Sequence, residues 1–97
     1  MDLNKFGRRA LKCAISRKKI TTETPIREET LKSLHDEVAE VDAASETELA
    51  EHLHGHSEMV EELVDVGIVV ITELTRRGID IEEVFHAKMK YNEKRTD

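Results

Sequence analysis

Apolar residues recur along this chain at intervals of three and four, which is the spacing of one face of an α-helix. The spacing predicts four main helices, over residues 2–19, 25–44 and 58–77 and from residue 81 onward. No segment alternates apolar and polar residues for long enough to predict a strand. The pattern therefore indicates an all-α fold, a four-helix bundle with one short extra helix and no sheet.

Residues that favour helix ends support these boundaries. The expected N-caps of the four main helices are Asp2, Thr24 before Pro25, Ser57 and Asp80. Gly78 follows the longest helix, where a residue in the left-handed conformation is favoured. Ser45-x-x-Glu48 has the form of a capping box. It predicts that the short extra helix begins there and is interrupted at Gly55.

The composition of the chain excludes disulfide-stabilised and membrane-spanning proteins. The chain has 97 residues and a net charge of −6, with +6 in residues 1–19, −12 in residues 20–66 and none in residues 67–97. The single cysteine, Cys13, excludes an intrachain disulfide, and its largely apolar surroundings predict a small core residue. The longest apolar run, Val66–Thr72, is shorter than the roughly 20 residues of a membrane span. We therefore expect a cytoplasmic protein with one domain.

Two acidic residues of the second helix lie beside its apolar stripe. That stripe consists of Leu31, Leu34, Val38 and Val41. Glu37 is three residues after Leu34 and four before Val41, so it lies inside or next to the stripe. Glu40 follows Glu37 at i+3, and both carboxylates therefore project from one side of the helix.

The longest helix carries a second pair of this kind. Glu62 and Asp65 are three residues apart and directly precede Val66–Ile71, a run that is apolar nearly all round. A helix of this type is expected to be the buried centre of a bundle. The pair should therefore lie close to the core.

Four carboxylates on two core helices need compensation, because desolvation and like-charge repulsion both disfavour their ionised forms. Magnesium binds carboxylate oxygens together with water and substrate phosphates. Two pairs on facing helices therefore predict an oxygen-rich metal site. The alternative is a set of solvated surface acids, since 21 Asp and Glu residues make chance pairs common.

Three segments, Asp36–Glu40, Glu61–Asp65 and Gly78–Arg95, resemble the MazG-like all-α nucleoside triphosphate pyrophosphohydrolases. The pattern of that family is E-E-x-x-E, a spacer, E-x-x-D and a later segment similar to K-M-x-x-N-x-x-R. The resemblance spans about residues 31–95, and Asp36 stands in place of the first glutamate. It implies one MazG-like domain over residues 1–97, with a basic helix at 1–19 and the catalytic bundle at 24–95.

The resemblance implies hydrolysis of an NTP or dNTP between the α and β phosphates, with Mg²⁺ as cofactor and Mn²⁺ as a substitute. Its implied metal ligands are Glu37, Glu40, Glu62 and Asp65. Its implied nucleotide-binding residues are Lys88, Asn92 and Arg95, which share one face of the last helix. The residue that takes the proton of the attacking water is left open among the catalytic candidates Glu37, Glu40 and Glu61.

Two other groups of residues suggest different chemistry. His52, His54 and His56 are typical transition-metal ligands, but alternate residues do not share a helix face, and a solvated loop is the preferred interpretation. A stripe of bases on the first helix is formed by Lys5, Arg8, Arg9 and Lys12. The chain is acidic overall, and the nearby Phe6 belongs to the apolar stripe of this helix and does not interleave the bases for stacking. Nucleic acid and membranes are therefore not the expected partners.

The expected partners are a nucleoside triphosphate and further copies of the chain, as a homodimer or homotetramer, because one small bundle has little core. A different class of function is a non-catalytic helical module with an interaction or regulatory role. The alternative enzymatic function is that of a phosphoribosyl-ATP pyrophosphohydrolase, an enzyme that uses similar acidic motifs.

Overall fold

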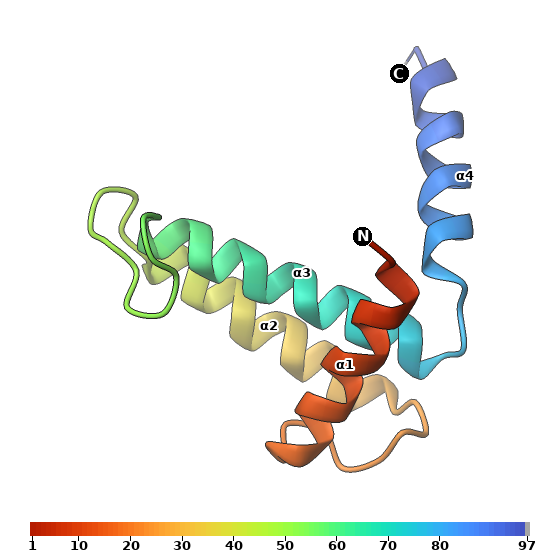
Figure 1. Cartoon of the computed structure of the whole chain (residues 1–97), viewed down its shortest axis with the longest axis horizontal. Helices are drawn as coiled ribbons and strands as arrows, with labels where there is room; N and C mark the ends of the chain where they lie inside the picture. Colours follow the sequence, from red (N-terminus) through yellow and green to blue (C-terminus); the bar gives the residue numbers. More distant parts are fainter. Residues whose placement is uncertain (97) are drawn as a thin grey trace. The chain divides into compact units, whose positions relative to one another are not determined.

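The computed structural model describes residues 1–96 and contains four α-helices and no named strand among them (Figure 1). The helices are α1 (Leu3–Ser16), α2 (Arg27–Ala43), α3 (Glu58–Arg76) and α4 (Ile81–Lys94). The predicted all-α class is confirmed. No helix in this part of the chain combines the length and the apolar character that crossing a membrane requires.

Local hydrogen bonds explain where three of the helices begin. Three predicted N-caps each accept a hydrogen bond from a backbone N–H three residues on: Asp2 from Lys5 (3.0 Å), Ser57 from Val60 (3.3 Å) and Asp80 from Glu83 (3.2 Å). The prediction for α2 is wrong by two residues, because Ile26 is its N-cap and makes no side-chain cap. Gly78 follows α3 with φ of +71°, as a left-handed residue at a helix end should.

The short extra helix predicted at Ser45 is not formed. Ser45 Oγ accepts hydrogen bonds from the N–H groups of Thr47 (3.1 Å) and Glu48 (2.9 Å), so the capping turn exists. The backbone then pairs across the loop instead of along a helix, with Ala50 N donating to the His56 carbonyl over 2.8 Å. A single helical turn is unfavourable unless the helix continues. The backbone hydrogen bonds across the loop therefore form in place of a helix, and residues 45–57 are a loop.

The chain divides into two compact units. The first unit consists of Met1–Thr24 and the chain from Ile71 onward, and the second consists of Pro25–Val70. Helix α3 runs from the second unit into the first, since Glu58 belongs to one and Arg76 to the other.

In the first unit, α1 packs closely on the last turns of α3 and the start of α4. Gly7 permits this approach, because a methyl group there would overlap Thr75 Oγ1 and lie 3.0 Å from Ile81 Cδ1. Asn4 joins the N-termini of α1 and α4, since its Oδ1 accepts from Ile81 N over 2.8 Å and its Nδ2 donates to Asp80 over 2.9 Å. The buried apolar residues of this unit are Ala10, Ile20 and Ile81.

In the second unit, α2 and the first part of α3 form an antiparallel hairpin closed by the loop at 45–57 (Figure 1). Glu37, at 5% exposure, is the one buried residue of this unit. No apolar residue of Pro25–Val70 is buried to that degree. The apolar side chains of the hairpin are therefore at most half-buried.

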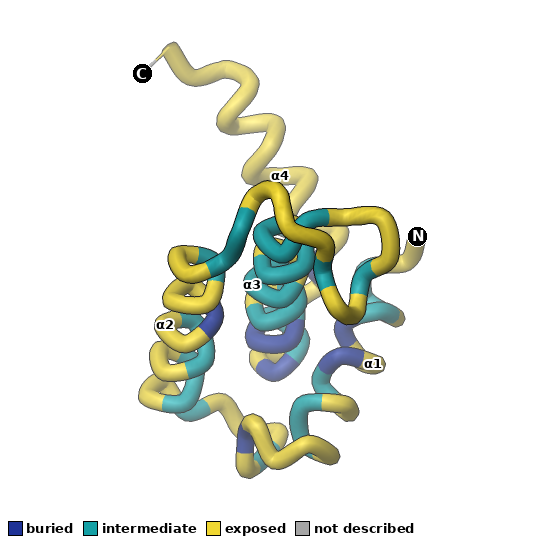
Figure 2. The backbone as a smooth tube through the Cα atoms, turned by 90° about the vertical axis from the view of Figure 1, so that its left-hand side faces the viewer, coloured by how far each residue is buried: buried dark blue, intermediate teal, exposed yellow. Residues whose placement is uncertain are grey.

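Burial along the chain differs from several predictions (Figure 2). Val38 of the predicted α2 stripe is 55% exposed, because Glu37 takes the buried position beside it. Cys13 is exposed, since α1 turns it away from the side that holds Gly7 and Ala10. Helix α3 is not buried on all sides, and every residue from 85 to 96, in α4 and just after it, is exposed.

Candidate metal centre

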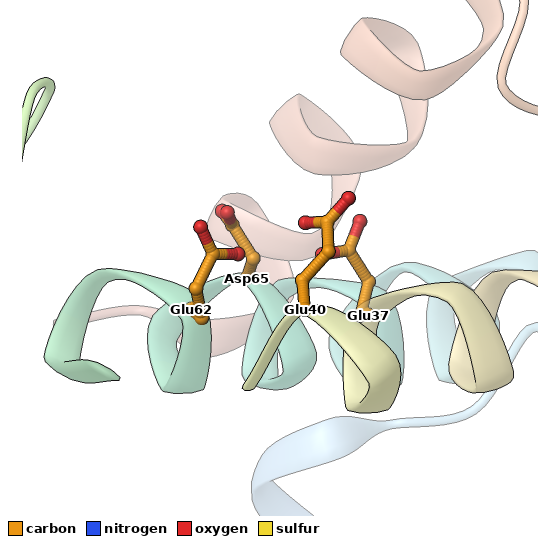
Figure 3. A group of neighbouring side chains, drawn as sticks. All are labelled: Glu37, Glu40, Glu62 and Asp65. Atoms are coloured by element: carbon orange, nitrogen blue, oxygen red, sulfur yellow. The ribbon is translucent and has the colours of Figure 1, made fainter. Parts of the chain in front are cut away.

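Four carboxylates converge on one side of the α2–α3 hairpin. Glu37 and Glu40 come from α2, and Glu62 and Asp65 come from α3 (Figure 3). Each contributes one oxygen atom, and these oxygens all lie within 4.8 Å of one another. The i, i+3 spacing within each helix and the antiparallel pairing of the helices together produce this cluster, which we call the carboxylate cluster.

The carboxylate cluster is partly withdrawn from water. Glu37 is buried, Glu62 and Asp65 are half-buried and Glu40 is exposed. Glu62 Oε2 is buried and has no hydrogen-bond partner among residues 1–96. A buried carboxylate oxygen without a partner costs free energy, and a cation beside it would remove that cost.

Burial raises the pKa of Glu62 to about 7. The adjacent Glu40 carboxyl and the negative charges of Asp65 and Glu37 act in the same direction. Desolvation and like-charge repulsion are the two physical causes expected when acids are crowded without a cation. At about pH 7, Glu62 is therefore protonated in about half of the molecules, and this proton partly offsets the charge of the cluster.

The donor set is made entirely of carboxylate oxygens, which suits a hard divalent cation such as Mg²⁺. The exposed Glu40 leaves one side of the cluster open to water. A cation there would have room for water ligands and for phosphate oxygens, as Mg²⁺ usually requires. The residues present therefore fit this cation.

Glu61, a catalytic candidate, lies outside the carboxylate cluster. Its Oε1 accepts a hydrogen bond from the backbone N–H of His52 over 3.0 Å. Glu58, one turn earlier, accepts from Ser45 N over 2.9 Å. These two carboxylates in the first turn of α3 fasten the loop at 45–57 to the hairpin. Glu58 was not identified from the sequence as a residue that binds the loop. Its position in the first turn of α3, where acidic side chains are favoured, was the available indication.

The predicted nucleotide-binding residues belong to the first unit and are exposed, Lys88 and Asn92 on α4 and Arg95 at its C-cap. Arg95 Nη1 donates a hydrogen bond to Asn92 Oδ1 over 3.2 Å. Lys88 Nζ lies 4.6 Å from the centre of the Tyr91 ring, and the Arg95 guanidinium lies 5.8 Å from it. Both cations therefore lie within cation–π distance of the Tyr91 ring.

The histidines of the loop do not form a metal site in the structure. His52, His54 and His56 are exposed, and within residues 1–96 the carboxylate cluster is the only group of three or more potential ligands close enough to share an ion. The interpretation of this segment as a solvated loop is consistent with that finding.

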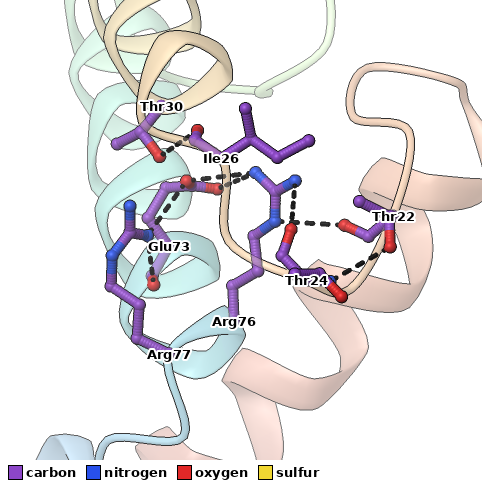
Figure 4. Close-up of polar contacts among 7 residues, drawn as sticks. All are labelled: Thr22, Thr24, Ile26, Thr30, Glu73, Arg76 and Arg77. Carbon is purple, nitrogen blue, oxygen red and sulfur yellow. Dashed lines mark hydrogen bonds and ion pairs between the residues drawn. The ribbon is translucent and has the colours of Figure 1, made fainter.

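Sequence reasoning missed a buried ionic network in the first unit (Figure 4). Glu73 and Arg76 are 6% and 5% exposed, and Arg76 Nη1 lies 3.3 Å from both carboxylate oxygens of Glu73. The same guanidinium donates to the carbonyls of Thr22 (3.1 Å) and Thr24 (3.0 Å). Arg77 Nη1 donates to the Glu73 carbonyl over 2.9 Å. The i, i+3 pair of opposite charge within an apolar helix was the available signal.

Comparison with known proteins adds no assignment to this geometry, since no family model, no curated protein and no solved structure matches the chain.

Proposed function

We propose that this protein is a cytoplasmic, Mg²⁺-dependent nucleotide pyrophosphohydrolase, which cleaves an NTP or dNTP to the monophosphate and pyrophosphate. The observation that carries the proposal is the convergence of four carboxylate oxygens within 4.8 Å, contributed by Glu37, Glu40, Glu62 and Asp65. The motif resemblance to the MazG-like enzymes supports the same residues. A homodimer or homotetramer is the proposed assembly.

The chemistry of the reaction suits the residues. A divalent cation held by the carboxylate cluster would neutralise phosphate charge and lower the pKa of the attacking water. Glu37 is buried and Glu62 and Asp65 are half-buried, whereas Glu40 is exposed on the open side. We therefore assign Glu40 as the residue that accepts the proton of the water, in addition to its place among the ligands.

The proposed phosphate contacts are Lys88, Asn92 and Arg95. Lysine contributes a point charge, asparagine an amide and arginine a planar fork, and together these suit the oxygens of a triphosphate. Tyr91 is exposed beside Lys88 and Arg95 and offers an aromatic face to the nucleobase.

The experiment measures pyrophosphate release across a panel of standard and modified nucleoside triphosphates, with Mg²⁺, with Mn²⁺ and with a chelator. We expect Mg²⁺-dependent release from at least one nucleotide, and we expect Glu40→Gln and Asp65→Asn to abolish it. Asp42→Asn is the matched control, because Asp42 is an exposed acid of α2 outside the cluster.

Binding of Mg²⁺ can be measured separately from turnover, as the thermal stabilisation that the metal confers on the folded protein. If Mg²⁺ stabilises the protein but no nucleotide releases pyrophosphate, the protein is instead a non-catalytic module with an interaction or regulatory role. Full turnover in both cluster variants would refute the site.

A further inference from the structure

The exposed side of α1 is basic. This helix contains four bases and no acid, and all four bases are exposed: Lys5, Arg8, Arg9 and Lys12. At 100° per residue they occupy about 100° of the helix circumference, on the side opposite the buried Gly7 and Ala10. We call these four residues the α1 basic face.

More bases follow directly after the helix. Residues 17–19, with the sequence Arg-Lys-Lys, are exposed as well, so the first 19 residues carry seven bases and one acid. That acid, Asp2, is occupied as the N-cap of α1, since its carboxylate accepts a hydrogen bond from Lys5 N over 3.0 Å. The basic charge of this segment is therefore not balanced from within it.

The bases of the α1 basic face repel one another. Side chains three and four residues apart are neighbours on a helix, and here every such pair within the face has the same charge. Lys5, Arg8 and Lys12 form no ion pair within residues 1–96, and the Arg9 guanidinium lies 5.8 Å from the centre of the Phe6 ring. An anionic partner would relieve this repulsion.

Several acids of the first unit are engaged away from the α1 basic face. Glu73 is paired with Arg76, with 3.3 Å between Oε2 and Nη1. Glu82 Oε1 accepts a hydrogen bond from Leu3 N over 2.9 Å. These carboxylates therefore stabilise the fold of the unit and do not neutralise the bases of α1.

The two units have opposite net charges. The first unit contains 13 Lys and Arg residues and 8 Asp and Glu residues, a net charge of +5, whereas Pro25–Val70 contains 2 and 13, a net charge of −11. The sequence argued against nucleic acid through the acidity of the whole chain, and that acidity belongs to the second unit. Since interactions between exposed charges fade over about 10 Å in ordinary salt, the local charge of a surface decides its partner.

We propose that the α1 basic face binds the phosphate backbone of double-stranded nucleic acid without reading its sequence. Lys5 and Lys12 are about 10 Å apart along the helix axis, and the phosphates of one strand follow each other at about 3.4 Å along the duplex. The face therefore matches the length of about three consecutive phosphates. Arginine and lysine both bind phosphate oxygens, the former as a planar fork. This binding does not depend on the proposed activity.

Single strands and membranes fit the α1 basic face less well. Proteins bind single strands by stacking the bases on aromatic rings, but Phe6, the one aromatic residue of α1, is half-buried beside Arg9. A helix that binds membranes inserts its apolar side into the lipid. The apolar side of α1 is already covered, because Gly7 lies against Thr75 and Ile81.

The first experiment measures binding of the full chain to a short labelled DNA duplex by fluorescence anisotropy, without Mg²⁺, so that the carboxylate cluster has no metal. We expect a dissociation constant of about 10⁻⁴ to 10⁻⁶ M at physiological salt, the usual range for binding without sequence specificity. Contacts with about four phosphates predict about 100-fold weaker binding at about 200 mM salt than at about 50 mM. No binding at about 50 mM salt would overturn the proposal.

A matched pair of double variants locates the contact on α1. Arg8→Gln with Lys12→Gln should weaken binding at low salt about tenfold or more, and should reduce the loss between the two salt concentrations to about tenfold. Arg27→Gln with Lys90→Gln removes the same charge from exposed residues of α2 and α4 and should bind like the wild type. Circular dichroism checks that both variants are folded. Equal losses in the two variants would show that only net charge matters and would refute the α1 contact.

Competing polyanions test the choice of a duplex. The same measurement uses a single strand of equal length and vesicles of phosphatidylglycerol and phosphatidylcholine. We expect the duplex to bind most tightly, and two duplexes of unrelated sequence to give the same dissociation constant. Tighter binding to the single strand or to the vesicles would contradict the proposal. A strong preference for one duplex sequence would contradict binding through the backbone alone.

Discussion

The backbone N–H of His52 donates a hydrogen bond to Oε1 of Glu61 over 3.0 Å. The carboxylate that the sequence presents as a catalytic candidate therefore holds a loop in place. Its neighbour Glu62 belongs to the carboxylate cluster. Adjacent residues of α3 thus have different tasks, and this difference can be tested by substitution.

Glu61→Gln should retain most of the nucleotide hydrolysis, because a glutamine oxygen can still accept the hydrogen bond from His52. Glu61→Ala removes the acceptor, and hydrogen exchange at the His52 amide should accelerate by about 3- to 10-fold, as expected for the loss of one net hydrogen bond. Exchange measured by NMR checks this expectation. Loss of turnover in Glu61→Gln with an unchanged loop would instead restore Glu61 as a catalytic base.

Glu62→Gln should stabilise the protein in metal-free buffer. The amide is uncharged, so it removes the repulsion between Glu62 and the acids around it. We expect a gain on the order of 1 kcal/mol, since water beside the exposed Glu40 screens part of that repulsion. Urea unfolding at pH 8 measures the change, with Asp42→Asn as the control. A variant less stable than the wild type under these conditions would show that the Glu62 charge is already balanced.

Stability of the metal-free protein should fall as the pH rises through about 7. The folded protein raises the pKa of Glu62 to about 7 from 4.5, so it binds this proton more tightly than the unfolded chain. The resulting stabilisation is complete below the unfolded value and is lost as the pH rises through the folded one. Thermal unfolding from about pH 6 to about pH 8 tests the slope.

Two further measurements tie that slope to the carboxylate cluster. Saturating Mg²⁺ should abolish the slope, because a cation replaces the proton as the balancing charge. Glu62→Gln should abolish it without any metal. A slope that persists in both conditions would have to come from a group outside the cluster.

Gly7→Ala should destabilise the fold by about 1–3 kcal/mol, the usual cost of inserting a methyl group into a packed contact. The added atom would overlap Thr75 Oγ1, and Ile71 Cγ2 and Ile81 Cδ1 are the next nearest atoms. The neighbouring Arg8→Ala serves as the control, since Arg8 is exposed. Equal unfolding free energies for the two variants would mean that α1 can shift to make room.

Arg76→Met should cost about 3–5 kcal/mol, because it leaves the buried carboxylate of Glu73 without its main partner. It also removes the hydrogen bonds to the carbonyls of Thr22 and Thr24. Arg77→Met should cost about 1 kcal/mol or less, since its side chain is 34% exposed. Chemical unfolding compares the two, and similar costs would show that Arg76 has no special role.

The helix ends that rest on one local hydrogen bond were predictable from the sequence. Asp2, Ser57 and Asp80 each cap a helix as expected, because the side chain and the N–H group that it accepts from are three residues apart. Ser45 forms the same kind of turn, but no helix follows it. Whether a helix continues from a capped turn depends on the hydrogen bonds that the following residues make. A four-residue motif does not determine these hydrogen bonds.

The four residues of the carboxylate cluster were also predictable, since the spacing within each helix and the apolar run after Asp65 marked them. The burial pattern of α2 was not. Periodicity favoured Val38 for the buried face, whereas the hairpin buries Glu37. The two positions are only 100° apart, so the choice depends on the rotation of α2 against α3, a tertiary property.

The loop at 45–57 connects the two halves of the carboxylate cluster, and this determines how the cluster can form during folding. Glu37 and Asp65 belong to one helical hairpin, so closing a single short loop brings all four ligands together. Contacts at short sequence separation form faster than contacts between distant segments. We therefore expect the cluster to assemble early in folding, which would allow a divalent cation to accelerate folding as well as stabilise the folded state.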